Sequence, residues 1–449
     1  MKRIIKRLST TQIILAGFLM IILIGSVLLS LPLSSANGKA VPYVDALFTS
    51  TTATCVTGLV TLPTVSAWST FGQAVILILI QIGGLGVITV AAGIMMMLGK
   101  RIGIDNRILI QDSFNLNSMS GMVKFIKKVI IGTFTVEAIG ALLYMTVFVP
   151  DFGLKGIWIS VFTSVSAFCN AGIDIISENS LCDYALNPVV NITTSFLIIT
   201  GGLGFVVWWD IARVITNKNR RRFRFLTLHS KIVLLVTAVL IFGGATLFFV
   251  FEYNNPLTIG NCSLAEKIEV SLFQSVTTRT AGFATVAQEN LTNASSVLSL
   301  LLMFIGGSPA GTAGGIKTVT FLVIFVTALS AVRNKKTVDL YNRQISEKAI
   351  KKAVAVFVTS FTVMFVSTLL LCTVSDGAFL DILYETVSAT ATVGLTRNFT
   401  STLGLLGKLI IILTMYFGRV GPISLAVAFN SKKGSENIIA NPVEEISVG

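Results

Sequence analysis

The chain has 449 residues, of which 53% are hydrophobic and only 12% are charged, and its mean hydropathy is +0.83. A soluble domain carries about 25% charged residues, so this composition excludes a soluble enzyme and indicates a polytopic membrane protein. The net charge of +13 then favours cytoplasmic loops that face anionic membrane lipid, and no nucleic-acid partner is expected.

Metal and redox chemistry find little support among the residues. The five cysteines show no CxxC spacing and the chain has one histidine, His229. We therefore predict neither a zinc nor a haem site, and no cofactor held by this chain. Cys182 and Cys262 fall in loops that we place outside the membrane, and a disulfide between them stays an open question.

Eight long apolar runs follow one another along the chain. They cover residues 12–31, 71–98, 122–149, 188–212, 230–251, 296–331, 350–374 and 403–428. Each run is long enough for a helix that crosses a hydrocarbon core of about 30 Å, which takes about 20 residues. The first run follows four basic residues, as in a signal peptide, but it is too long for one, and we interpret it as an uncleaved helix.

The basic residues predict the orientation of these helices. Basic residues gather in five segments, with four at the N-terminus, six in 99–128, seven in 213–231, seven in 332–352 and two at 432–433. Together these segments carry 26 of the 34 basic residues in the chain. The alternating segments on the other side carry six. Both termini are therefore predicted to be cytoplasmic.

A short, moderately apolar segment of about 12–14 residues follows the first helix of each pair, too short to cross a membrane. These segments are residues 43–54, 157–168, 264–277 and 379–391, and they suggest re-entrant half-helices. Each leads into a six-residue stretch with one glycine near its end: TCVTGL at 54–59 (string 1), FCNAGI at 168–173 (string 2), TRTAGF at 278–283 (string 3) and TATVGL at 390–395 (string 4).

The glycines of the strings are spaced by 114, 110 and 112 residues, and a second glycine-rich patch follows each string. The patches begin at Gly83, Gly201, Gly306 and Gly418, which lie 25, 29, 24 and 24 residues after the string glycine. A fixed period of this kind indicates internal duplication. It predicts repeat 1 over residues 1–98, repeat 2 over 99–216, repeat 3 over 217–332, repeat 4 over 333–430, and a cytoplasmic tail over 431–449.

The repeated unit is suited to a cation pore. An ion that leaves water needs oxygen atoms in place of its hydration shell, and backbone carbonyls in an extended segment can provide them. Glycine reaches backbone conformations with positive φ, and irregular backbone inside a membrane occurs where it lines a cavity. We therefore predict an all-α polytopic membrane protein with four helix–pore-helix–helix repeats, arranged with pseudo-four-fold symmetry around one ion pore.

Over nearly the whole chain these motifs resemble those of the Trk/Ktr/HKT superfamily of potassium transport proteins, and within it the KtrB-type (KtrB/KtrD) membrane subunits. The resemblance implies potassium uptake across the bacterial cell membrane, with potassium as permeant ion and sodium as a possible activator. It also implies a homodimer on a cytosolic ring of KtrA/KtrC-type subunits, which would bind the regulatory nucleotide. The chain has no GxGxxG motif in a nucleotide-binding unit of its own.

The resemblance also assigns residues to a selectivity filter. It makes the string glycines the filter glycines, and in plant relatives a glycine rather than a serine in the first string is associated with preference for potassium over sodium. The filter glycines would be Gly58, Gly172, Gly282 and Gly394, and the lining carbonyls those of Val56, Thr57, Asn170, Ala171, Thr280, Ala281, Thr392 and Val393.

The third post-string helix is predicted to be broken, because five glycines and a proline lie in the middle of its apolar run. Such a segment inside a membrane must line a cavity, and we interpret it as a mobile gate beneath the strings. A kink that serves helix packing is the alternative. The segment comprises Gly306, Gly307, Ser308, Pro309, Ala310, Gly311, Thr312, Ala313, Gly314, Gly315 and, at its end, Lys317.

Several charged residues lie within the apolar runs or strings, and four of them call for an explanation. Arg419 should face the pore as an electrostatic part of the gate, or else a carboxylate, because a charge at that depth costs about 2.5–3.5 kcal/mol on insertion scales. Arg279, inside string 3, should point behind the string, since a cation in the ion path would block it. Glu137 and Lys317 receive no partner from the sequence.

The main alternative is a sodium-coupled symporter of a small organic solute, because such carriers also use broken helices and internal repeats. They are usually built from two inverted halves rather than from four repeats with re-entrant strings. A membrane receptor or scaffold has no need of four such strings, and an enzyme would need a polar catalytic cluster, which the sequence lacks.

Overall fold

The computed structural model describes residues 10–98, 103, 108, 110, 121–216, 223–335 and 337–421. The predicted tail 431–449 and the four N-terminal basic residues lie outside these ranges. The described chain is built of helices, apart from a small hairpin of β1 (Asp339–Leu340) and β2 (Arg343–Gln344), and short 3-10 turns at Pro32–Ser34, Cys182–Tyr184, Phe223–Phe225, Gln288–Asn290 and Thr400–Thr402.

One sequence of helices occurs four times along the chain: a long helix, a short helix and a helix of 12–16 residues. The long helices are α2 (Thr10–Ser30), α8 (Met122–Phe152), α12 (Leu228–Glu252) and α16 (Glu347–Val374). The short helices are α3 (Tyr43–Cys55), α9 (Lys155–Cys169), α13 (Leu264–Thr277) and α17 (Phe379–Ala391). The third helices are α5 (Thr70–Leu85), α10 (Pro188–Leu203), α14 (Asn293–Phe304) and α18 (Leu405–Val420).

The short helices confirm the predicted half-helices, and each end lies within two residues of its predicted position. Their boundaries follow from local chemistry. Ser263 and Glu266 form a capping box at the start of α13, which satisfies amide groups that have no partner inside the helix. At the other end α3, α9 and α17 each stop at a residue with left-handed backbone, which cannot continue a right-handed helix.

Two of the eight apolar runs are sharply bent, which was not predicted, and a third is interrupted, as its glycines and proline predict. Four helices in the described chain are long and apolar enough to cross a membrane, namely the long helix of each unit. The run 71–98 is α5 followed by α6 (Val87–Met97), bent by 100°, and the run 188–212 is α10 followed by α11 (Phe205–Thr216), bent by 96°. The run 296–331 is α14 and α15 (Thr318–Val332), separated by residues 305–317.

The bends occur at glycines with left-handed backbone. Gly86 has a φ of +84° and Gly204 a φ of +87°, a conformation that glycine adopts without steric cost. Both glycines sit in apolar sequence that is compatible with a straight helix, and this is why the sequence alone did not reveal the bends.

A hydroxyl group fixes each short helix to the long helix of its own unit. Ser50 donates to the carbonyl of Ile22 at 2.7 Å, Ser164 to that of Glu137 at 2.6 Å, and Ser275 to that of Ile241 at 2.8 Å. In the fourth unit Thr386 and Thr368 share a hydrogen bond of 2.8 Å. Inside a membrane, hydrogen bonds of this kind and close packing of small residues hold helices together.

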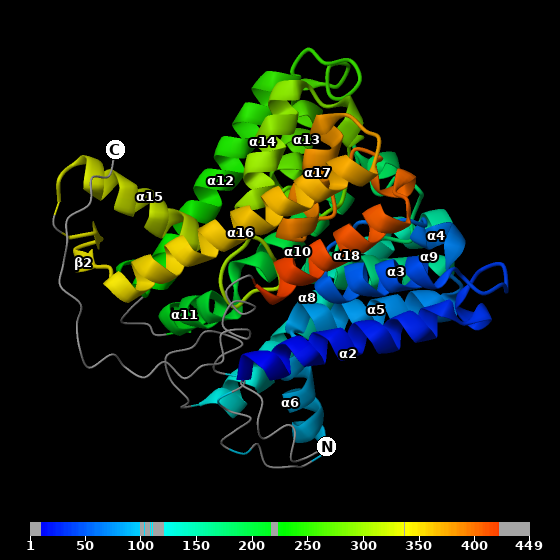
Figure 1. Cartoon of the computed structure of the whole chain (residues 1–449), viewed down its shortest axis with the longest axis horizontal. Coiled ribbons are helices and arrows are strands. Elements are labelled where there is room, and N and C mark those ends of the chain that lie inside the picture. Colours follow the sequence, from blue (N-terminus) through cyan, green and yellow to red (C-terminus); the bar gives the residue numbers. More distant parts are fainter. Residues whose placement is uncertain are drawn as a thin grey trace.

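The four units close into a ring. The third helix of each unit packs on the short helix of the next one, through the pairs α5 with α9, α10 with α13, α14 with α17, and α18 with α3. Figure 1 shows part of this arrangement, with α2, α5, α3 and α18 side by side. The last pair joins the C-terminal unit to the N-terminal one, so the short helices surround a common centre.

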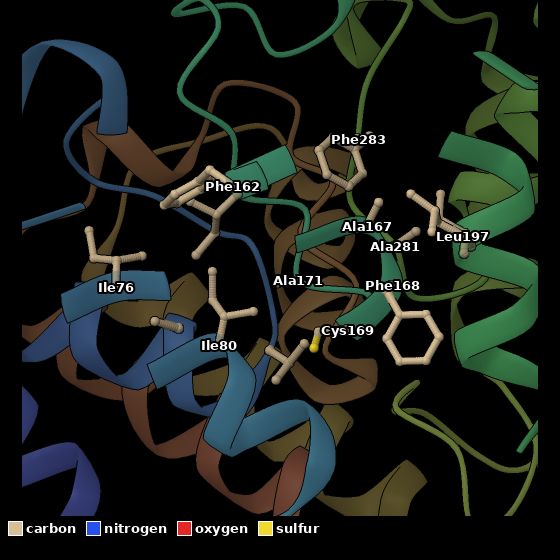
Figure 2. Close-up of a cluster of buried hydrophobic side chains, with 14 of the residues drawn as sticks. Ile76, Ile80, Phe162, Ala167, Phe168, Cys169, Ala171, Leu197, Ala281 and Phe283 are labelled. Atoms are coloured by element: carbon tan, nitrogen blue, oxygen red, sulfur yellow. The ribbon is translucent and has the colours of Figure 1, made fainter. Parts of the chain in front are cut away.

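Large apolar side chains fill the contacts between units. Figure 2 shows the cluster between the first two units, where Ile76 and Ile80 of α5 lie near Phe162 of α9, while Phe168 lies on the other side, toward Leu197. Ala171 of string 2 and Ala281 of string 3 belong to the same cluster and are fully buried. The strings are therefore held inside the protein core rather than on its surface.

Candidate functional site

Each short helix passes into its string through a residue with left-handed backbone two positions before the string glycine. The φ values are +56° at Val56, +60° at Asn170, +68° at Thr280 and +51° at Thr392. Positive φ is uncommon outside glycine and costs energy, so its presence at four equivalent positions indicates a functional constraint. Sequence analysis missed this feature, because of the four residues only Asn170 is of a type that favours left-handed backbone.

The next amide in each string donates back to the short helix. Thr57 donates to the carbonyl of Thr52 at 2.9 Å, and the same bond occurs in strings 2, 3 and 4 at 2.8, 3.0 and 2.8 Å, from Ala171 to Ser166, Ala281 to Thr277, and Val393 to Ser388. These amides donate to their own short helix and not to a neighbouring string. The string carbonyls are therefore free for another partner.

The hydroxyl of the same helix residue supports the string from behind. Thr52 accepts from the amide of Gly58 at 2.9 Å and Ser388 from that of Gly394 at 3.0 Å. Ser166 accepts from the amide of Ile173 at 3.1 Å, and Thr277 donates to the carbonyl of Phe283 at 2.5 Å. A hydroxyl five or six residues before each string glycine was the signal that sequence analysis overlooked.

The four string glycines meet at one place. Their φ values are +106° at Gly58, +63° at Gly172, +83° at Gly282 and +98° at Gly394. A Cβ atom built on Gly58 would lie 2.6 Å from the carbonyl oxygen of Ala171, and one on Gly172 would lie 2.6 Å from that of Ala281. A Cβ on Gly282 would collide with the carbonyl of Val393, and one on Gly394 with that of Thr57.

These contacts run from string 1 to 2, 2 to 3, 3 to 4 and 4 to 1, and so they form a closed ring. All twelve predicted filter residues are buried in this ring or next to it. Any side chain at the glycine positions would push into the backbone of the neighbouring string. Glycine is needed here both for its φ and for the close approach.

The ring is rich in oxygen atoms without a protein partner. Within the described residues, no hydrogen bond reaches the backbone carbonyls at 56, 57, 170, 171, 280, 281, 392 and 393. The side-chain oxygens of Thr57, Asn170, Thr280 and Thr392 are likewise buried without a partner there. Buried oxygens of this kind are costly unless something binds them, and a dehydrated alkali cation is a chemically suitable ligand.

The second glycine marker has a packing role. A Cβ on the first glycine of these patches would collide with a backbone carbonyl at the end of the short helix of the same unit. The colliding pairs are Gly83 with Thr54, Gly201 with Phe168, and Gly418 with Thr390, and each carbonyl lies four positions before the string glycine. The patches therefore let the third helix lie directly against the end of the short helix. In the third unit the corresponding glycine, Gly306, is instead packed against Gly314 of the segment 305–317.

Residues 305–317 form the predicted break, which we call the intramembrane loop. Its ends are joined by a parallel bridge between Ile305 and Ile316. The amides of Ser308 and Thr312 donate to Gly202 at 2.9 Å and Gly201 at 3.1 Å, and Phe205 donates to the carbonyl of Ala310 at 2.9 Å. The loop and the α10–α11 bend thus satisfy each other's free backbone groups, as irregular backbone inside a membrane must.

Arg419 of α18 joins the loop to the first unit. Its guanidinium donates to the carbonyl of Thr312 at 2.6 Å, to that of Gly83 at 2.5 Å and to that of Gly84 at 3.5 Å. No described carboxylate forms a salt bridge with it, and it lines the cavity described below. Lys317 donates to the carbonyl of Ala313 at 2.5 Å.

Two other buried charged residues lie behind the strings. Arg279 extends toward Thr237 of α12, with 3.5 Å between its guanidinium and the hydroxyl oxygen, and thus points away from the ring as expected. Glu137 of α8 accepts from the amide of Gln81 at 3.3 Å and lies 4.0 Å from the thiol of Cys169. Cys182 and Cys262 are both free thiols.

A cavity of about 650 Å³ borders the loop. Pro309, Gly311, Lys317 and Arg419 line it together with Phe18 and His229, and Thr390 and Ala391 of string 4 also reach it. The loop and Arg419 therefore border a cavity that extends to the start of string 4.

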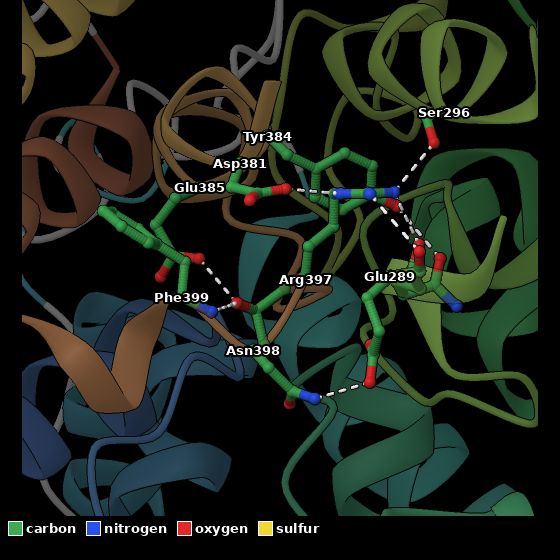
Figure 3. A network of polar contacts seen from close by, with 10 residues as sticks. Glu289, Ser296, Asp381, Tyr384, Glu385, Arg397, Asn398 and Phe399 are labelled. Carbon is green, nitrogen blue, oxygen red and sulfur yellow. Dashed lines mark hydrogen bonds and ion pairs between the residues drawn. The ribbon is translucent and has the colours of Figure 1, made fainter. Parts of the chain in front are cut away.

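On the opposite side, the strings continue into a polar network that ties the third unit to the fourth (Figure 3). Arg397, three residues after the glycine of string 4, pairs with Asp381 at 2.7 Å and donates to the carbonyl of Gln288 at 2.8 Å and to Ser296 at 3.0 Å. Asn398 donates to Glu289 at 2.6 Å. Nothing in the sequence pairs these residues, and the network is a tertiary feature.

Comparison with known proteins gives a consistent result. The family model TrkH, described as a cation transport protein, matches residues 8–440. The Ktr system potassium uptake protein B of Bacillus subtilis (strain 168) is 40% identical over 99% of this chain and 97% of its own length. The potassium/sodium uptake protein NtpJ of Enterococcus hirae is 39% identical over 100% of this chain and 99% of its own.

Among solved structures, the potassium transporter TrkH from Vibrio parahaemolyticus matches with a TM-score of 0.73. The match covers 92% of this chain and 84% of the other, at 16% sequence identity. At that identity the match establishes the fold alone.

Proposed function

This chain belongs to the TrkH family of cation transport proteins, a family of transporters rather than of enzymes, and on that premise we propose that it takes up potassium ions through the ring of four strings. The relatives named potassium uptake protein and potassium/sodium uptake protein support the ion. The observation that carries the proposal is the closed ring of glycines surrounded by unpaired carbonyl oxygens.

In this proposal the carbonyls one and two positions before each string glycine replace the hydration shell of the ion. The short helices direct their C-terminal ends, which carry partial negative charge, toward the ring and favour a cation there. The filter residues are those proposed from the sequence, in strings 1 to 4. The repeats proposed from the sequence end at residues 98, 216, 332 and 430, and this division is part of the proposal.

The intramembrane loop and Arg419 would act as the gate. Loop residues and Arg419 line the inner cavity, the loop bonds to string 2 through Thr312, and Arg419 would add a positive charge in the path of a cation. We further propose that a cytosolic nucleotide-binding ring of the kind implied by the Ktr relatives moves this loop, with the pore chain as a homodimer in the bacterial cell membrane and both termini cytoplasmic. Sodium would serve as an activator.

The substitution Gly58→Ser tests the filter. A side chain at this position meets the carbonyl of Ala171 and must distort string 1, so we expect the ratio of potassium to sodium flux to fall. The measurement is flux of rubidium and sodium into vesicles that contain the full chain. Gly38→Ser is a matched control, since Gly38 also has a positive φ of +65° but no atom lies within 4 Å of its Cβ position.

An unchanged flux ratio in folded Gly58→Ser would contradict the filter. The same vesicles also separate the pore from a solute symporter. Rubidium flux without any organic solute is expected here, whereas a symporter would need its solute.

A further inference from the structure

Thr312 occupies the centre of the intramembrane loop and connects it to three other parts of the protein. It is completely buried. Its hydroxyl donates to the carbonyl of Phe168 at 3.0 Å and accepts from the side-chain amide of Asn170 at 3.3 Å. Its backbone amide donates to Gly201 at 3.1 Å, and its carbonyl accepts from Arg419 at 2.6 Å.

Two of these four bonds reach string 2. Phe168 is the first residue of string 2, and Asn170 contributes one of the candidate filter carbonyls. In the described part of the loop, no other residue forms a hydrogen bond to a string. Residues at the position of Asn170 in the other strings are Val56, Thr280 and Thr392, and the hydroxyls of both threonines are buried without a partner among the described residues. String 2 is therefore distinguished from the other three by its direct bond to the loop.

We propose that Thr312 couples the intramembrane loop to string 2, so that the preference among cations depends on the position of the loop. This proposal rests on the proposed function, because it assumes that the strings select the ion and that the loop moves. Thr312 is a positioning residue: its hydroxyl acts on the ion only through the backbone of string 2.

The physical basis is the loss of partners when the loop moves. With the loop in place, the hydroxyl of Thr312 satisfies the Phe168 carbonyl and holds the Asn170 side chain, whose backbone has a φ of +60°. When the loop leaves, both groups lose that partner in a buried site, where unpaired polar groups are costly. String 2 must then adjust, whereas strings 1, 3 and 4, which form no hydrogen bond to the loop among the described residues, lose none.

The substitution Thr312→Val removes both hydroxyl bonds and keeps the shape of the side chain and the two backbone bonds. We expect it to change the ratio of rubidium to sodium flux by about two- to tenfold, the factor that corresponds to one net hydrogen bond. Thr312→Ser retains a hydroxyl and should restore the original ratio. Thr327→Val is the matched control, because the hydroxyl of Thr327 bonds only within α15, to Val323, and its loss should leave the ratio unchanged.

The measurement uses the full chain in vesicles, with total rubidium flux recorded beside the flux ratio. If Thr312→Val changes total flux and leaves the ratio unaltered, Thr312 only holds the gate and the coupling is refuted. Asn170→Val removes one of the same bonds from the other side and introduces the residue of string 1. Should Thr312→Val fail to fold, an unchanged ratio in Asn170→Val refutes the coupling instead.

Combining the two substitutions gives a further test. If the bond between Thr312 and Asn170 carries the coupling, the double variant should shift the ratio less than the product of the two single effects; independent effects would overturn the proposal. Gly58→Ser in the same vesicles keeps the two hypotheses apart. If Gly58→Ser alters the flux ratio and Thr312→Val leaves it unchanged, the coupling alone is refuted. If Gly58→Ser leaves the flux ratio unchanged, the filter itself is refuted.

Discussion

Replacing Arg419 by alanine should release the intramembrane loop. Arg419 is anchored to α5 by its bonds to the carbonyls of Gly83 and Gly84, and it reaches the loop by the bond to Thr312. Only the bond to Thr312 has to break when the loop moves. The stabilisation of the closed loop by Arg419 is therefore that of one charge-assisted hydrogen bond.

A hydrogen bond to a charged group contributes about 1.5–3 kcal/mol net, because it replaces bonds to water. Since about 1.4 kcal/mol corresponds to a tenfold change in an equilibrium, Arg419→Ala should shift the loop toward its open position by about ten- to hundredfold. The measured flux should rise by less than this once the open state is the major one. Removal of a positive charge from the cation path acts in the same direction.

The assay is rubidium uptake into vesicles that contain equal amounts of folded protein, as judged by size-exclusion chromatography and thermal unfolding. Arg213→Ala is the matched control, because Arg213 lies on α11 and pairs with Asp210, away from the loop. We expect increased flux for Arg419→Ala and an unchanged rate for Arg213→Ala. Equal or lower flux in folded Arg419→Ala would refute the reasoning.

A second substitution separates the two contributions of Arg419. Arg419→Lys retains the charge but loses the planar guanidinium that reaches two carbonyls at once. If the bond to Thr312 is what closes the loop, Arg419→Lys should raise flux nearly as much as Arg419→Ala. If the charge is the barrier, flux through Arg419→Lys should stay close to that of the unaltered protein.

Three further outcomes are expected. Deletion of residues 309–315 should raise rubidium flux, because it removes the proposed barrier; lost flux in a folded variant would contradict this. Gly201→Ala should lower the free energy of unfolding by about 1–3 kcal/mol in thermal or denaturant unfolding, as overpacking does, since its Cβ collides with the Phe168 carbonyl, whereas Gly243→Ala, with open space, should be tolerated. Burial raises the pKa of Asp174, in the loop beyond string 2, to about 6. The contribution of Asp174 to stability is then present at low pH and lost as the pH rises through about 6, so Asp174→Asn should stabilise the protein at pH 8 but not at pH 4. Equal differences in melting temperature at both pH values would disprove this.

Several parts of the site could be predicted from the sequence because they repeat. The half-helices were placed nearly to the residue, because each is a short apolar segment that leads to a glycine recurring with a period of about 112 residues. The glycine patches were also found by their register. Their role, the close approach of Gly83, Gly201 and Gly418 to a backbone carbonyl, needed the coordinates.

The sequence by itself determined the class of the protein, the four strings and the break in the third unit, because composition, period and the mid-span proline are local properties of the chain. Tertiary structure alone decided that α5 and α10 bend at Gly86 and Gly204, and that Arg419 donates a hydrogen bond to Thr312. The physical reason is that a glycine in an apolar run fits a straight helix equally well. The bend becomes stable only when another unit supplies partners for the backbone groups it frees, and those partners lie more than a hundred residues away in the chain.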